Sequence, residues 1–168
     1  MNFRHCQLSL VAACALYMAL VVFNNLSDYD SNLQLVQHVL AMDTTFPGNS
    51  GLWRAINIPF VHHAFYASII IWEAVIAGLL VSGSCRLWST CGADSAAWRA
   101  AKSRANTGLT LGMLLWFLAF ITVGGEWFLM WQSSKWNGLG PALRMFTVMG
   151  LVFIVLSLPE DRVAGDKA

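Results

Sequence analysis

Hydrophobic and polar positions alternate along this chain in long blocks, and four of the apolar blocks are long enough to cross a membrane. An α-helix rises about 1.5 Å per residue, so about 20 apolar residues span a hydrocarbon core of about 30 Å. Windows of this length cover residues 7–26, 60–82, 108–127 and 139–158. The pattern predicts an all-α, polytopic membrane protein in which residues 1–168 form one domain, a bundle of four transmembrane helices.

The composition agrees with this class. Hydrophobic residues make up 57% of the chain and charged residues 11%, which is more apolar and less charged than a soluble domain. The net charge is +1 and no long basic run is present, so the sequence carries no signal for nucleic-acid binding. The lipid bilayer is therefore the first expected partner.

The basic residues predict the orientation, because Lys and Arg near the ends of spanning helices stay on the cytoplasmic side. The segment 83–107 contains a single acid, Asp94, and the basic residues Arg86, Arg99, Lys102 and Arg104. We expect this segment to be a cytoplasmic loop, of which the Ala-rich stretch 96–105 can extend the third spanning helix. Residues 27–59 and 128–138 are then the outer loops, and both termini are cytoplasmic.

The first outer loop contains a short amphipathic helix. Asp30 or Ser31 is a suitable N-cap, and one face carries the apolar residues Leu35, Val36, Val39 and Met42. We expect this helix to lie flat on the outer surface. Amphipathic indoles favour the headgroup level of a membrane. Tryptophans at that level predict an aromatic-rich lid made by the two outer loops: Trp53, Trp127, Trp131 and Trp136.

Small residues mark the expected helix contacts. Gly108 and Gly112 have the GxxxG spacing, and Ala74 and Gly78 form a second pair of small residues four apart. The pair 124–125 is Gly-Gly, which allows a second segment to approach closely or the helix to bend.

One stripe on the second predicted helix combines polar and aromatic side chains: His62, Tyr66, Ile69 and Glu73. Their spacing of three and four residues places them on one face. Glu73 lies about 16.5 Å below His62, near the middle of the bilayer. An ionised carboxylate there costs ~2.5–3.5 kcal/mol, so we expect Glu73 to face the bundle and to be protonated or paired. Two roles remain open: a hydrogen-bonded packing residue, or a proton acceptor beneath a quinone or ion path.

The expected outer side also gathers charged and imidazole side chains outside that stripe: His38, Asp43, Arg54, His63, Glu126 and Arg144. Histidine and carboxylate ligands bind copper or zinc, which makes His38, His62, His63 and Glu126 weak candidate ligands. No HxxxH or CxxC spacing is present, so no metal is assigned. The alternative is a polar lid in which Asp and His cap helix ends and pair with Arg54 and Arg144. In particular, we expect Glu126 to pair with Arg144 or to be capped by loop donors.

Two organic cofactors deserve comparison. A bis-histidine haem needs imidazoles from two helices, and only one predicted span contains histidine. A quinone or lipid pocket is more compatible, with Trp116, Tyr66, His62 and Glu73 as an aromatic and proton-accepting wall. The simpler interpretation of these side chains is internal packing with satisfied hydrogen bonds.

Several local motifs together resemble a bacterial family of predicted small integral membrane proteins, the domain of unknown function 2165. The resemblance runs over almost the whole chain. It rests on Asn24-Asn25 with Asp28-Tyr29, on residues 37–47 and 53–56, and above all on residues 124–138. It implies a four-helix protein of the bacterial inner membrane whose motif residues crowd on the outer side, and it supplies no activity.

The sequence contains no nucleophile paired with a base, no phosphate-binding glycine loop and no zinc motif, which disfavours an enzyme. Three functions remain. We favour an accessory or assembly subunit of a larger membrane complex, because four helices bury little interior and offer much lateral surface to partner subunits. The alternatives are a redox, quinone- or metal-handling protein with its site at the outer face, and a minimal transporter or proton path.

Overall fold

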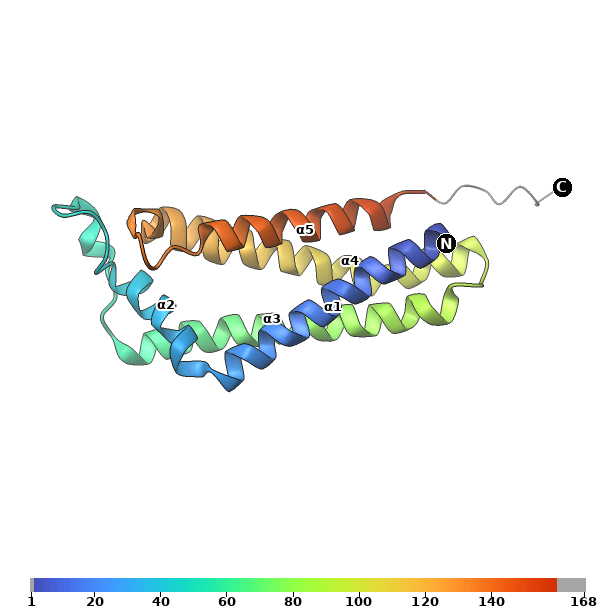
Figure 1. The fold of residues 1–168 in the computed structure, drawn as a ribbon, viewed down its shortest axis with the longest axis horizontal. Coiled ribbons are helices and arrows are strands. Elements are labelled where there is room, and N and C mark those ends of the chain that lie inside the picture. Colours follow the sequence, from blue (N-terminus) through green and yellow to red (C-terminus); the bar gives the residue numbers. More distant parts are fainter. Residues whose placement is uncertain (1, 160–168) are drawn as a thin grey trace.

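The computed structural model describes residues 2–159. Within them, four long helical rods run antiparallel, up and down, in chain order (Figure 1). The rods are α1 (Phe3–Ser27), α3 (Pro59–Thr90), α4 (Ser95–Leu114) continued by the π-helix η2 (Leu115–Trp127), and α5 (Leu139–Ser157). Shorter elements connect them: α2 (Tyr29–Ala41), η1 (Ser50–Arg54) and η3 (Met130–Gln132).

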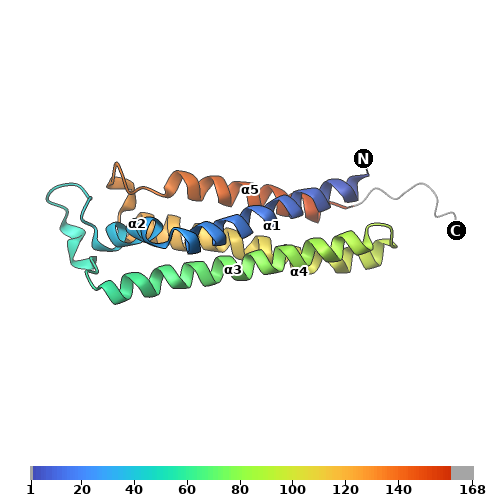
Figure 2. The same cartoon turned by 60° about the horizontal axis from the view of Figure 1, so that its bottom comes forward.

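The bundle has two different ends, which we name for their contents. The lid end contains residues 28–58 and 128–138, and the hairpin end contains the start of α1 and the turn at residues 91–94. Figure 2 shows that α1 and α5 both reach the hairpin end while α2 and the long connections stay at the other. The bundle therefore has a folded cap on one end only.

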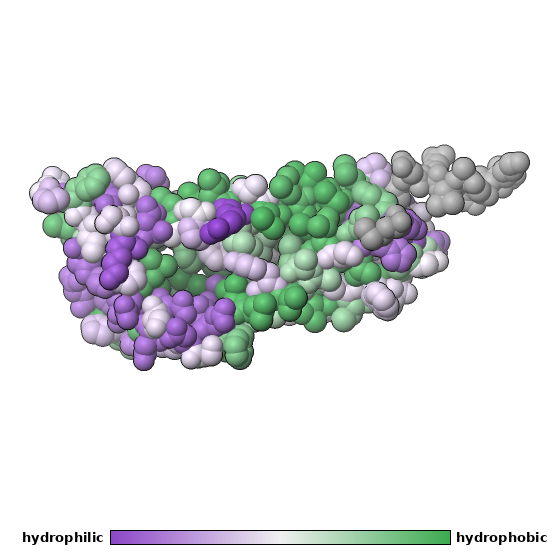
Figure 3. Space-filling model, in the orientation of Figure 1, coloured by the Kyte–Doolittle hydropathy of each residue, from purple (hydrophilic) through white to green (hydrophobic). Residues whose placement is uncertain are grey.

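All four rods are long and apolar enough to cross a membrane, which confirms the predicted spans. Figure 3 shows the consequence on one face, where hydrophobic residues cover the middle of the rods and hydrophilic residues gather mainly over the lid end. Exposed hydrophobic side chains in the middle of α1, α3 and α5 include Leu16, Ile71 and Leu151, as expected for a lipid-facing surface. The chain is an integral membrane protein.

Most of the predicted loop at residues 83–107 is helix, as expected for the stretch 96–105 but not for residues 83–90. α3 continues to Thr90 and α4 already begins at Ser95, which leaves only a tight turn. Asp94 starts α4, since its side chain accepts hydrogen bonds from the Ala97 and Ala96 backbone N–H groups. These two bonds hold the pKa of the Asp94 carboxyl below its usual value. At 32 residues, α3 is about 48 Å long and extends beyond a 30 Å hydrocarbon core.

A buried glutamine closes the hairpin end. Gln7 of α1 is fully buried and donates from Nε2 to the Val155 carbonyl oxygen of α5 at 2.8 Å. Its Oε1 accepts a hydrogen bond from the indole nitrogen of Trp98 in α4 at 3.3 Å. One polar side chain thus joins three helices where they converge.

Glycines allow the rods to approach closely. A Cβ on Gly83 would lie 2.8 Å from the Ala105 backbone nitrogen, so α3 and α4 are in contact there. Gly108 and Gly112 of the GxxxG pair also face neighbouring helices, Gly108 against Leu80 and Gly112 against Met149. The predicted contact at Ala74 and Gly78 is wrong, since both residues are exposed.

α1 and α5 separate toward the lid end, and α2 crosses back over that end of the bundle (Figures 1 and 2). The predicted amphipathic helix is confirmed, but it runs obliquely rather than flat. Leu33 packs against Tyr66 and Ile70 of α3, and Leu40 packs against Phe128. α2 is tilted because its two ends bury apolar residues against different parts of the bundle.

The π-helix η2 was not predicted. Its 13 residues form the lid-end half of the third rod, which runs antiparallel to α5. It ends where the Phe128 N–H bonds to the Val123 carbonyl, five residues back. Within it, Gly124 lies against the Met130 side chain and Gly125 against Leu139, so the predicted close approach at the glycine pair is confirmed. π-Helical turns are rare and change the angular spacing of side chains.

Candidate functional site

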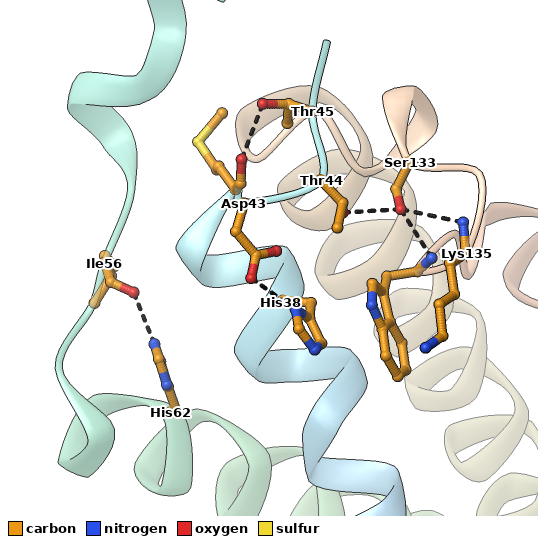
Figure 4. A network of polar contacts seen from close by, with 10 residues as sticks. His38, Asp43, Thr44, Thr45, Ile56, His62, Ser133 and Lys135 are labelled. Atoms are coloured by element: carbon orange, nitrogen blue, oxygen red, sulfur yellow. Dashed lines mark hydrogen bonds and ion pairs between the residues drawn. The ribbon is translucent and has the colours of Figure 1, made fainter. Parts of the chain in front are cut away.

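Ser133 joins the two connecting segments at the lid end (Figure 4). This buried hydroxyl accepts hydrogen bonds from the backbone N–H groups of Lys135 and Trp136, and from the Thr44 hydroxyl at 2.9 Å. Nearby, the Gln132 side chain accepts a bond from the Phe46 backbone N–H at 3.0 Å. The expectation that the two segments fold together as one lid is confirmed.

His38 and Asp43 form the one ion pair between described side chains that the lid contains. His38 Nδ1 lies 2.7 Å from Asp43 Oδ2, and both side chains are partly exposed. The imidazole stacks on the indole of Trp136, with ring centroids 4.4 Å apart, and Lys135 Nζ lies 4.7 Å from the same indole. His38 is therefore held between a carboxylate and an aromatic ring.

Arg54 is held by aromatic rings and one carbonyl. Its guanidinium carbon lies 5.9 Å from the Trp53 ring centroid and 5.6 Å from that of Trp127, and Nε donates to the Gly51 carbonyl. The two indoles meet edge to face. The expected pairing of Arg54 with an acid is wrong, because tryptophans take that place.

The candidate metal ligands do not converge. The ring of His62 bonds through Nε2 to the Ile56 carbonyl at 2.7 Å, and His63 Nδ1 lies 3.0 Å from the Tyr29 hydroxyl. Over residues 2–159, no three His, Cys, Asp or Glu side chains gather in a metal-binding arrangement. The geometry gives the copper and zinc hypothesis no support.

The predicted pairing of Glu126 with Arg144 is also wrong. Both side chains are exposed, and neither has a hydrogen bond or ion pair with any residue between positions 2 and 159. The reason lies in η2, whose π-helical turn places Glu126 at a different angle from the one an α-helix predicts. Arg144 is thus a basic residue within a membrane-spanning helix that has no acidic partner in the described chain.

Glu73 faces the bundle as predicted, and its partner is an asparagine. Only 2% of Glu73 is exposed, and Oε2 accepts a hydrogen bond of 2.6 Å from Asn25 Nδ2 of α1. Asn25 also accepts, through its carbonyl, a bond from the Tyr66 hydroxyl. Of the two open roles, this geometry favours a hydrogen-bonded packing residue. The signal for Asn25 was its place in an apolar helix, since an amide there needs a polar partner.

Helix contacts place two further polar residues at a depth similar to that of Glu73. Gly112 of α4 lies against Ile76 of α3 and Met149 of α5, so these positions share one level. Three polar residues lie about one helical turn nearer the lid end: Glu73, Trp116 and Arg144. The buried Trp116 indole N–H has no hydrogen-bond partner among residues 2–159.

Tyr17 of α1 connects this level to α5. It is half-exposed and lies within electrostatic range of both Arg144 and Glu73. The open side between α1 and α5 is therefore bordered by a phenol and a guanidinium. Sequence reasoning gave Tyr17 no role, because it falls on none of the polar stripes.

An apolar pocket of about 50 Å³ lies beneath α2, between α3 and η2. Its walls include Val36, Leu40, Ile69, Phe120 and Val123, and none of its lining side chains is charged. Ligand sites for small molecules have volumes of about 300–1,000 Å³. The pocket is too narrow for a quinone ring, and His62, Tyr66 and Glu73 bond to protein groups instead of facing a ligand.

The model of one protein family, described as predicted small integral membrane protein (DUF2165), matches residues 3–159. The chain belongs to this family. No curated protein and no solved structure matches the chain. For this member of DUF2165, the site residues must therefore be interpreted from their own geometry.

Separate substitutions of Glu73 and Asn25 test whether the hydrogen bond between them has a packing role. Glu73→Gln keeps an oxygen that accepts from Asn25, so the free energy of unfolding should change by less than about 1 kcal/mol. Asn25→Leu removes the donor and should lower it by roughly 1–2 kcal/mol, since hydrogen bonds between membrane helices reach about that size. Unfolding in mixed micelles measures both. Asn24→Leu is the matched control, because Asn24 is exposed; equal losses for Asn24 and Asn25 would contradict the assignment.

Proposed function

We propose that this protein is an accessory subunit of a larger complex in the bacterial inner membrane. The observation that supports this proposal is Arg144, an exposed guanidinium in the spanning helix α5 without an acidic partner in residues 2–159. Arg144 is the sixth residue of this 19-residue helix. Basic residues within membrane-spanning segments are rare and almost always pair with an acid or face a polar cavity. A carboxylate on a helix of another subunit would supply the missing partner.

The place of Arg144 favours a lateral protein contact. Arg144 is exposed on α5, and it lies within electrostatic range of Tyr17 of α1, which adds a second polar group there. The outward faces of α5 also present large apolar side chains, including Leu143, Val148 and Leu151. A partner helix could cover these and place its acid beside Arg144.

The other functions find less support. A metal-handling role lacks a ligand cluster among the described residues, and a quinone role lacks a pocket of sufficient volume. A proton path would need a chain of polar groups continuing below Glu73, and the core on that side is made of Ile76, Ala77 and Leu80. The accessory role therefore remains the best supported.

Affinity purification from native membranes tests the proposal through Arg144. A stoichiometric membrane partner should co-purify with the wild-type chain and with Arg144→Lys. Its recovery should fall at least about tenfold with Arg144→Gln, because the acid of the partner subunit would then be buried without its basic partner. Arg86→Gln is the control, since Arg86 is exposed on α3 near the other end.

Two outcomes would contradict the proposal. Equal recovery of a partner with Arg144→Gln would mean that Arg144 only extends toward the headgroups. Purification of the chain alone under every mild detergent tested would mean that it has no stable subunit partner.

We also propose that the hairpin end is cytoplasmic, as the basic residues of segment 83–107 indicate. A thiol reagent that cannot cross the membrane should label cysteines introduced at Ser50 or Ser134 in the lid of intact cells. It should spare one at Ser95, which begins α4 at the opposite end. All three positions are exposed, so the reverse labelling pattern would show the opposite orientation.

A further inference from the structure

One side of α4 carries a polar hollow near the hairpin end. It is an open surface hollow with a volume of about 530 Å³. All residues that line it belong to α4: Arg99, Ser103, Asn106, Thr107, Thr110 and Leu111. Their spacing places them on one face of the helix, so a hydroxyl and amide stripe faces outward from a rod that spans the membrane.

Most polar side chains of this stripe make no hydrogen bond within residues 2–159; the exception is Thr107, whose hydroxyl donates to the Ser103 carbonyl oxygen at 3.1 Å. Arg99, Ser103 and Thr110 are exposed, and their side chains donate no hydrogen bond to any residue in the range 2–159. The amide of Asn106 is also unused, and its Oδ1 atom is buried without a partner. The exposed donors of Arg99, Ser103 and Thr110 are therefore available to a molecule outside the chain.

The depth of the hollow coincides with a membrane interface. Gly108, in the middle of the hollow's length, packs against Leu80 of α3. Leu80 follows Pro59, the first residue of α3, by about 31 Å of helix, which is close to the ~30 Å thickness of the hydrocarbon core. Phosphate groups of the leaflet at the hairpin end therefore lie near Arg99 and Ser103, while Leu111 lies on the hydrocarbon side.

The charge at this end favours an anion. Arg86, Arg99 and Arg104 are exposed, and Asp94 is the one acid of segment 83–107. The Asp94 carboxylate is already bonded to the backbone N–H groups that start α4. An anionic ligand at the hollow thus meets guanidinium and hydroxyl donors, and one acid, Asp94, lies within electrostatic range of Arg99.

We propose that the hollow binds the headgroup of an anionic phospholipid. The Arg99 guanidinium donates two hydrogen bonds to the phosphate, a geometry that suits arginine. The Ser103 and Thr110 hydroxyls donate to the phosphate and glycerol oxygens, and the acyl chains pass over Leu111 into the bilayer. Basic sites at the surface of transmembrane helices recognise anionic lipids through this combination of charge and hydrogen bonding.

Native mass spectrometry of the purified full chain tests the proposal. Phosphatidylglycerol and phosphatidylcholine with identical acyl chains are added at equal concentrations. The wild-type chain should retain the first phosphatidylglycerol at least about tenfold more tightly than phosphatidylcholine, because only the former carries net negative charge. Arg99→Gln should remove most of this preference. Arg86→Gln removes the same charge from the neighbouring helix α3 and should keep it.

A second variant tests the contribution of the hydroxyl hydrogen bonds separately from that of the charge. Ser103→Ala combined with Thr110→Val keeps every charge and should weaken phosphatidylglycerol binding by roughly threefold or more, while the thermal midpoint without lipid stays within a few degrees of wild type. Equal losses in the Arg99 and Arg86 variants, or equal retention of the two lipids, would overturn the proposal. Full competition by millimolar inorganic phosphate would assign the hollow to free phosphate and overturn it as well.

Discussion

Trp98→Ala is expected to lower the free energy of unfolding by about 3–5 kcal/mol, the range measured when buried tryptophan or phenylalanine is truncated. Trp98 is fully buried at the hairpin end, and its indole N–H donates to Gln7 Oε1. The substitution leaves a cavity and removes that donor. Since Gln7 also bonds to the Val155 carbonyl, the loss extends to the contact between α1 and α5.

Two further variants separate these contributions. Trp98→Phe keeps most of the ring but leaves Gln7 Oε1 without its donor, so about 1–3 kcal/mol should be lost. Trp88→Ala is the matched control, because 76% of Trp88 is exposed on α3. Reversible unfolding in mixed micelles gives the three values. Similar losses for Trp88 and Trp98 would contradict the buried contact at this end.

Gly83→Ala is the second large expected effect. Its new Cβ would lie 2.8 Å from the Ala105 backbone nitrogen and 3.0 Å from Ala105 Cα, and neither atom can move without shifting α4. Forcing extra volume into a packed interface costs about 1–3 kcal/mol, and here it outweighs the gain of up to ~1 kcal/mol from replacing glycine in a helix.

Gly78→Ala in the same helix is the control. No atom lies within 4 Å of a Cβ at Gly78, so only the helix propensity changes and stability should stay equal or rise. The pair of variants can be compared in one unfolding series. If Gly83→Ala is as stable as Gly78→Ala, α3 and α4 do not meet at Ala105.

The spans were predictable because hydrocarbon thickness sets the length of an apolar block, and α1, α3 and α5 follow that rule. The stripe from His62 to Glu73 was predictable for a similar reason, since an α-helix has a fixed angular period. Within residues 83–107, composition indicated helix for the Ala-rich stretch 96–105, but it indicated neither the extension of α3 to Thr90 nor the Asp94 cap, because hydropathy ends at the membrane surface.

Helix contacts were only partly predictable. The spacing of small residues identified Gly108 and Gly112 correctly, and it failed at Ala74 and Gly78, because spacing does not say which face meets a neighbour. Gly83 has no small partner four residues away on the bundle side, so no motif marks it. Its role depends on Ala105, which lies on another helix.

Polar partners were the least predictable part of the site. The Glu126 and Arg144 expectation assumed an α-helical period through residues that form the π-helix η2. Asn25 and Gln7 are single amides in apolar helices, and the sequence shows that they need partners without showing which ones. The partners, Glu73 and Trp98, are set by how α1 packs on α3 and α4.

The most direct test of the proposed function is photo-cross-linking at Val148, which is exposed on α5 one turn from Arg144. A cross-linking residue there should form a discrete adduct with one membrane protein in living cells, and Arg144→Gln in the same chain should abolish it. Val81, equally apolar and exposed on α3, is the reference position and should give no such adduct. Adducts with lipid alone at Val148, or the same protein adduct at both positions, would contradict a subunit docked beside Arg144.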